Sequence, residues 1–319
     1  MVTNNQMTLK QLLSIFVRGF AMGSADVVPG VSGGTIAFIS GIYPRLIKSL
    51  TSFDMTAVKL VLRLQFRALF EHVDALFLAV LFLGVFSAIG TLAHGVAYLL
   101  ETYPVLLWSF FFGLILASAL SMLREVSRSL RARDVIPFLT GCGFILFVST
   151  TGAVTLEPSL PMVFLAGCIA ISAMLLPGVS GSFLLVLMGL YATMIDAIKS
   201  FNLPYILFFV AGAGVGFLGF SRVIRWLLTN WYRPTLLFLI GLLLGSLYVV
   251  WPWKIIVAEF SKNLSPAAYA LQVGEPMLVF ASLSALVGVG LVVALELVFG
   301  RRKGLSQNEE GAQRVPPSV

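Results

Sequence analysis

The chain has 319 residues, of which 59% are hydrophobic and only 11% are charged, and its formal net charge at pH 7 is +7. A soluble domain of this length presents far more polar and charged side chains to water. The composition therefore excludes a soluble globular protein and predicts several membrane spans of about 20 residues each. The two cysteines, Cys142 and Cys168, lie in apolar segments without metal-ligand spacing, so we expect both to be packing residues.

The first apolar region, residues 9–53, contains its own break. The stretch VVPGVSGGTIAFISGIY, from Val27 to Tyr43, places one proline and four glycines where a membrane helix would carry Leu and Ala. Proline and glycine both disfavour the interior of a helix. We therefore expect a re-entrant helical hairpin, which enters and leaves the membrane on the same side.

Residues 54–74 predict an amphipathic helix that lies in the membrane interface. Lys59, Arg63 and Arg67 recur at i, i+4 and i+8, beside an apolar stripe, which is the pattern of an interfacial helix. Membrane spans are then predicted at roughly 75–100, 103–122 and 135–151.

A second broken region, residues 161–200, repeats the first. LLPGVSGSFLLVLMGLY runs from Leu175 to Tyr191, and sliding 27–53 onto 175–201 gives 10 identities in 27 positions. Three more spans are predicted at roughly 204–228, 234–253 and 276–299. An internal repeat of this kind decides the fold class. We predict an all-α polytopic membrane protein of two repeats, residues 1–152 and 153–300, each with one re-entrant hairpin and three transmembrane helices, followed by a polar tail at 301–319.

The distribution of positive charge predicts the topology. If both broken regions are re-entrant hairpins, 18 of the 21 Lys and Arg residues fall on one face of the membrane, and Lys199, Lys254 and Lys262 fall on the other. Cytoplasmic loops carry this excess of positive charge. Both termini are then cytoplasmic, the two repeats have inverted topology, and the basic pI needs no nucleic-acid partner.

A Pro-Gly break at membrane depth predicts an anion site. It leaves free N–H groups at the start of the next half-helix, where the helix dipole is positive, and non-helical backbone is tolerated there only inside protein or beside water. Two such loops near the midplane would hold phosphate or carboxylate. The alternative is that the Gly and Ser residues only allow close helix packing.

The motif ADVVPGVSGGTIAFISGIY, with its second copy LLPGVSGS, resembles the PopT polyprenyl-phosphate transporter family. The resemblance extends from about Thr8 to Gly300. It implies translocation of undecaprenyl phosphate, the carrier lipid of cell-wall synthesis, across the bacterial inner membrane, with membrane lipids as the surroundings and no enzymatic reaction. The candidate binding residues that it carries over are Asp26, Pro29, Gly30, Ser32, Gly33, Gly34, Thr35, Pro177, Gly178, Ser180 and Gly181.

Further candidates come from polar residues near the breaks. Arg18 is a possible phosphate partner or a residue that snorkels to the cytoplasm, and Arg45 is a headgroup guide or a positive-inside anchor. Ser24 and Ser182 add hydroxyl groups to the proposed site. No cofactor or metal is expected.

Asp26 would repel an anion unless it is protonated, bound to a cation or paired. It is therefore either a coupling residue for H⁺ or Na⁺ or a cap of the half-helix. In the second copy Met174 replaces Asp26 and Ser182 replaces Gly34, so the two halves of the site cannot have equal roles.

Two alternative functions stay open at this point. A polyprenyl-diphosphate phosphatase also uses re-entrant loops, but its motif carries an arginine where this chain has Gly33 and Gly181, and phosphoryl transfer needs cationic charge there. A transporter of a small soluble anion could use the same loops. The sequence leaves the oligomeric state, the coupling ion and the direction of transport open.

Overall fold

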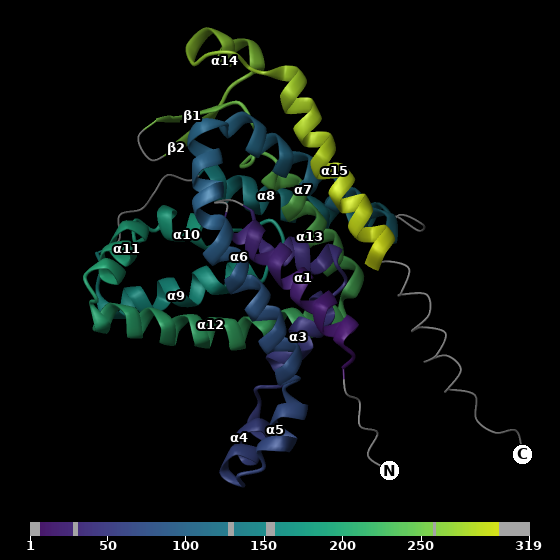
Figure 1. Ribbon diagram of the computed structural model, residues 1–319, viewed down its shortest axis with the longest axis vertical. Helices are drawn as coiled ribbons and strands as arrows, with labels where there is room; N and C mark the ends of the chain where they lie inside the picture. Colours follow the sequence, from purple (N-terminus) through teal and green to yellow (C-terminus); the bar gives the residue numbers. More distant parts are fainter. Residues whose placement is uncertain (1–6, 28–30, 127–130, 151–156, 258–259, 300–319) are drawn as a thin grey trace, which may run out of the picture.

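Short broken helices alternate with long ones along the chain in the computed structural model, which describes residues 7–27, 31–126, 131–150, 157–257 and 260–299 (Figure 1). The first half contains α1 (Leu9–Asp26), α2 (Gly33–Ile39), α3 (Tyr43–Thr51), α4 (Met55–Leu62), α5 (Phe66–His72), α6 (Ala75–Thr102), α7 (Pro104–Val126), the 3₁₀ turn η2 (Ala132–Asp134) and α8 (Val135–Thr150). The second half contains α9 (Leu160–Met174), α10 (Gly181–Leu187), α11 (Tyr191–Lys199), α12 (Leu203–Asn230), α13 (Tyr232–Ser246), β1 (Lys254–Val257), β2 (Phe260–Asn263), α14 (Pro266–Gln272) and α15 (Leu278–Phe299).

The prediction of a mostly helical, polytopic membrane protein is confirmed. Within the described residues, five helices are long and apolar enough to cross a bilayer: Ala75–Thr102, Pro104–Arg124, Ala132–Thr150, Leu203–Asn230 and Leu278–Leu297. The pair α10 and α11 is also apolar but bends by 107° at its break. That bend is the geometry of a broken span or a re-entrant loop.

The break between the short helices is made in the same way in both halves. Gly41 follows α2 with φ 74°, and Gly189 follows α10 with φ 69°. After each helix, three backbone N–H groups donate back to its last turns, Ile42 N–H to Ala37 O and Leu190 N–H to Leu185 O among them. This cap needs a residue in the left-handed conformation, which glycine adopts without strain.

Three details of the sequence prediction are wrong. The interfacial helix over 54–74 is two short helices, because Leu64 adopts φ 53° and α4 ends there in a cap of the same kind. The span predicted at 234–253 ends at Ser246, before Pro252, and the chain then turns into an antiparallel pair, β1–β2, with Lys254 opposite Asn263. This strand pair is a local departure in a described chain that is mostly helical, as predicted for an all-α membrane protein.

Four helix pairs form the body of the molecule: α1 with α6, α9 with α12, α7 with α15, and α8 with α13. Figure 1 shows α9 and α12 lying side by side along one edge of the molecule. Glycines allow the closest approaches. A Cβ at Gly84 would strike the Phe16 carbonyl in the first half, and a Cβ at Gly212 would strike the Phe164 carbonyl in the second. Each half therefore has a close glycine crossing between the first helix of its broken region and a later long helix.

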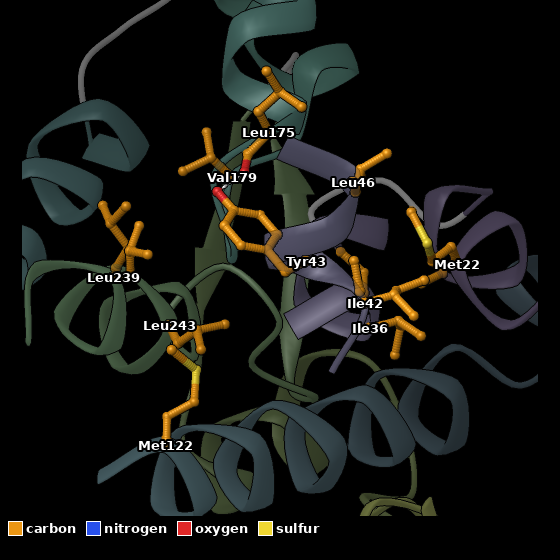
Figure 2. Packing of buried hydrophobic residues seen from close by; sticks show 14 of the residues in the cluster. Met22, Ile36, Ile42, Tyr43, Leu46, Met122, Leu175, Val179, Leu239 and Leu243 are labelled. Atoms are coloured by element: carbon orange, nitrogen blue, oxygen red, sulfur yellow. Dashed lines mark hydrogen bonds between the residues drawn. The ribbon is translucent and has the colours of Figure 1, made fainter. Parts of the chain in front are cut away.

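Helix α13 is the centre of the hydrophobic core. Leu236, Leu239 and Ile240 are fully buried, which explains why this helix is apolar on all sides from Leu236 to Leu244. Figure 2 shows Leu239 and Leu243 facing the residues of the two broken regions, with Tyr43 directed at Leu175. The core thus surrounds the described parts of the two loops, residues 31–33 and 177–181.

Three of the basic residues used in the topology prediction bind neighbouring elements of the chain. Arg222 donates to the Phe53 carbonyl and Arg225 to the Thr51 hydroxyl, so α12 holds the C-terminal end of α3, where a cation also complements the helix dipole. Arg233 pairs with the buried Asp134 in front of α8.

The glycine crossings give a direct test of the packing. Gly84→Ala should destabilise the protein by about 1–3 kcal/mol, because its Cβ meets backbone that cannot move aside. Thermal unfolding in detergent measures the effect. Gly90→Ala on the same helix is the matched control, since nothing lies within 4 Å of its Cβ position, and equal stabilities of the two variants would contradict so close a crossing of α1 and α6.

Candidate functional site

The first loop is closed by its own side chains. Asp26, at the end of α1, accepts a hydrogen bond from the Gly33 N–H at 2.6 Å, and the Ser32 hydroxyl accepts one from the Gly34 N–H at 3.1 Å. Both bonds satisfy N–H groups at the start of α2 that have no partner within the helix. A Cβ at Gly33 would collide with the Asp26 carboxylate. Asp26 therefore occupies the place where the sequence predicted an anionic ligand.

The two loops bind one another directly. The Ser32 hydroxyl lies 3.3 Å from both the Met174 and the Leu176 carbonyl oxygens, and the Gly178 N–H donates to the Thr35 hydroxyl at 3.1 Å. Gly178 adopts φ 83°, a conformation that strains other residues. The structure thus brings together the loops that the sequence placed 148 residues apart.

Tyr43 completes this junction. Its hydroxyl donates to the Leu175 carbonyl at 2.9 Å, and its ring is 1% exposed (Figure 2). The sequence analysis did not select Tyr43 as a site residue, although it belongs to both copies of the motif, as Tyr43 and Tyr191. Tyr191 is exposed, so the repeat alone could not tell which tyrosine joins the loops.

The second loop is less closed than the first. Met174 stands where the first copy has Asp26, and the N-cap residue of α10, Ser180, makes no side-chain hydrogen bond to the backbone of that helix. Instead the Ser180 hydroxyl lies 2.9 Å from the Ser182 hydroxyl. The start of α10 therefore lacks the side-chain caps that Asp26 and Ser32 provide at the start of α2. The Ser182 hydroxyl, which is only partly buried, could still bind a ligand there.

The remaining predicted residues have separate surroundings. Arg45 forms a two-pronged ion pair with Asp74, at 2.7 and 3.0 Å, and its guanidinium lies over the Phe77 ring. Ser24 donates to the Phe20 carbonyl within α1, and Arg18 lies further back on that helix, partly buried. Pro29 and Gly30 lie outside the described residues.

Comparison with known proteins identifies the family. A family model described as VCA0040-like, undecaprenyl phosphate translocase-like, matches residues 22–266. This chain belongs to that family. It is 41% identical over 296 residues to the polyprenyl-phosphate transporter of Vibrio cholerae serotype O1, which covers 89% of this chain and 96% of the relative. It is also 33% identical over 264 residues to the polyprenyl-phosphate transporter of Staphylococcus aureus, covering 74% of this chain and 85% of the relative.

The VCA0040-like family and both relatives are named as a translocase or as transporters. This places the chain with transporters rather than with the phosphatases considered from the sequence. No solved structure matches the chain.

The junction between the loops can be tested at Thr35. Thr35→Val keeps the size of the side chain but leaves the buried Gly178 N–H without its acceptor, so we expect a loss of about 1–3 kcal/mol of stability. Thr35→Ser retains the hydroxyl and serves as the control. Thermal unfolding of both variants in the same detergent decides the matter, and equal melting temperatures would show that this bond is unimportant.

Proposed function

We propose that the chain moves polyprenyl phosphate, such as undecaprenyl phosphate, across the bacterial inner membrane for reuse in cell-envelope synthesis. Membership of a family whose relatives are named polyprenyl-phosphate transporters supports the substrate class. The observation that supports the site is the direct junction of two glycine- and serine-rich loops from the two halves. The phosphate would be held between these loops.

The physical problem of the reaction lies in the headgroup. A phosphate needs polar partners throughout its passage, because transferring a bare charge into hydrocarbon is very unfavourable. The prenyl chain is apolar and is soluble in the bilayer. A protein that surrounds only the headgroup and leaves the chain in lipid through a lateral opening solves this problem. Half-helices that begin at membrane depth provide backbone N–H donors for such a group.

Alternating access follows from two repeats of inverted topology, with both termini in the cytoplasm. Each half would take in turn the conformation of the other, which opens the site to one side and then to the other. The matching contacts of Gly84 and Gly212 support a common packing of the two halves. In the conformation seen here the loops are shut, since Ser32 is 2% and Ser180 is 7% exposed.

Asp26 gives the loops a means of coupling to an ion. Its carboxylate already accepts the Gly33 N–H, and a phosphate near that N–H group would be repelled by the negative charge. Protonation of Asp26, or a Na⁺ ion beside it, removes the repulsion. We propose that the headgroup and the neutralised Asp26 share the junction during one step of the cycle.

Ser182→Val tests the contribution of the second loop. It removes a hydroxyl that faces Ser180 without disturbing the contacts of the first loop, so transport of a fluorescent polyprenyl phosphate in proteoliposomes should fall by about tenfold or more, the effect of one lost charge-assisted hydrogen bond. Ser200→Val, on the exposed end of α11, is the matched control. Unchanged transport in Ser182→Val would remove this loop from the site, and release of inorganic phosphate from a prenyl diphosphate would favour the enzyme alternative.

Asp26→Asn tests the coupling. The amide imitates the neutral carboxyl group, so transport should lose its dependence on an imposed pH or Na⁺ gradient while binding of the lipid persists. Asp54→Asn is the control, because Asp54 also caps a short helix but lies on the exposed α4. A variant that keeps the wild-type response to both gradients would show that Asp26 is only a cap.

A further inference from the structure

A cavity that is largely open to its surroundings lies beside β2, just past the C-terminal end of α13. Its volume is about 440 Å³, within the usual range for small-molecule sites. Seven residues line it: Phe112, Leu247, Tyr248, Trp251, Asn263, Leu264 and Ser265. None of them is acidic, and most of the wall is apolar, so the cavity suits a ligand with a hydrocarbon part and no positive charge.

A lysine stands next to this cavity. Lys254 is opposite the lining residue Asn263 in the β1–β2 pair, and its Nζ donates to the Val249 carbonyl at 2.7 Å. Val249 directly follows the lining residue Tyr248. The ammonium also lies 3.2 Å from the centre of the Trp108 ring, and Trp108 is one helical turn before the lining residue Phe112. Lys254 is not itself a lining residue, but these three neighbours place it directly behind the cavity wall.

Lys254 is mostly buried, and its ammonium group contacts the Val249 carbonyl and the Trp108 ring. An ammonium group has three N–H donors, and one of them is used by Val249. Burial lowers the pKa of Lys254 to about 7, which means that a neighbouring anion would stabilise its charged form. Its environment therefore favours a negative ligand over a neutral one.

The hydrogen-bonding groups of the cavity agree with this charge. The Ser265 side chain accepts from the Ala268 N–H, which leaves its own O–H free to donate, and Asn263 uses one amide N–H on the Tyr248 carbonyl and keeps the other. Tyr and Trp side chains gather where a membrane protein meets the interface, and Tyr248, Trp251 and Trp253 are of this kind. An amphipathic lipid at that depth places its headgroup toward water and its chain toward the hydrocarbon.

We propose that this cavity is a second site for the prenyl phosphate, in which Lys254 faces the phosphate and the aromatic wall contacts the first isoprene units. The proposal rests on the proposed function for the class of substrate. It assigns to the β1–β2 end of the molecule a place where the lipid is received or released, one helical turn beyond the α13 residues that pack against Gly178 of the second loop. Lys262, on the neighbouring strand, is exposed and takes no part.

The test measures binding to the full-length protein in detergent with three probes: farnesyl phosphate, farnesol and inorganic phosphate. Lys254→Met should lower the affinity for farnesyl phosphate by about tenfold, the effect of one charge-assisted hydrogen bond. The affinity for farnesol should stay unchanged. Lys254→Arg should stay near wild type. Trp251→Leu should weaken the binding of both prenyl ligands, because it replaces a large aromatic surface of the wall with a smaller side chain. Lys262→Met is the matched control and should change nothing.

Three results would overturn the site. A Lys254→Met variant that loses farnesyl phosphate and farnesol equally has only lost the shape of the cavity, and one that binds both like wild type shows that the lysine faces no ligand. Inorganic phosphate that binds as tightly as farnesyl phosphate shows that the aromatic wall contributes nothing. The melting temperature of each variant shows whether it is folded. If Lys254→Met is not folded, the affinities of Lys254→Arg and Trp251→Leu decide the test.

Transport by the wild-type protein separates this inference from the proposed function. If proteoliposomes translocate the lipid but Lys254→Met binds both prenyl ligands normally, the second site is wrong and the function stands. If the wild type does not translocate while Lys254 still distinguishes farnesyl phosphate from farnesol, the site stands and the proposed function is wrong.

Discussion

The structure depends on how it satisfies the backbone of two helices that are broken inside an apolar protein. A free N–H or C=O group costs several kcal/mol where water cannot reach it. Here the carbonyls at the end of α9 accept from Ser32 and Tyr43 of the first half, and the Gly178 N–H is bound by Thr35. Each break provides the partners that the other lacks. Neither half could bury its own loop alone, so the junction also fixes how the halves pack.

The same junction limits how the protein can change conformation. Ser32 binds two carbonyl groups just before the second Pro-Gly turn, and Thr35 binds the Gly178 N–H within it. The loops therefore cannot separate one bond at a time without leaving buried polar groups unpaired. A headgroup that supplies replacement acceptors and donors would lower that cost. The tight glycine crossings of α1 with α6 and of α9 with α12 hold the long helices as rigid pairs, so motion would be concentrated at the loops and at the turns after α2 and α10.

The two loops are similar in sequence but unequal in charge. Asp26 gives the first loop a built-in anion at the start of α2, whereas Met174 leaves the start of α10 with hydroxyl groups alone. An external anion and the Asp26 carboxylate are both negative and both suit the start of α2. They therefore repel each other unless one of the two charges is neutralised. Lys254 is positively charged when protonated, and its strand β1 lies at the other end of the molecule from α4 and α5 (Figure 1). The charges thus place a repelling group at the junction and an attracting group near the cavity.

The sequence by itself determined the fold class, the order of the long helices and the pairing of the two PGVSG motifs, because hydrophobic length and local breaks are set by consecutive residues. It also placed Asp26, Ser32, Thr35 and Gly178 near one another through the repeat. Tertiary structure alone decided that Asp26 accepts a hydrogen bond at the start of α2 and that Arg45 forms an ion pair with Asp74. It also decided that Tyr43, and not Tyr191, donates a hydrogen bond to the other loop. It also decided that the chain after Ser246 forms a strand pair with Lys254 on Trp108. These contacts join residues distant in the chain, and which partner a buried polar group finds depends on packing that no local pattern encodes.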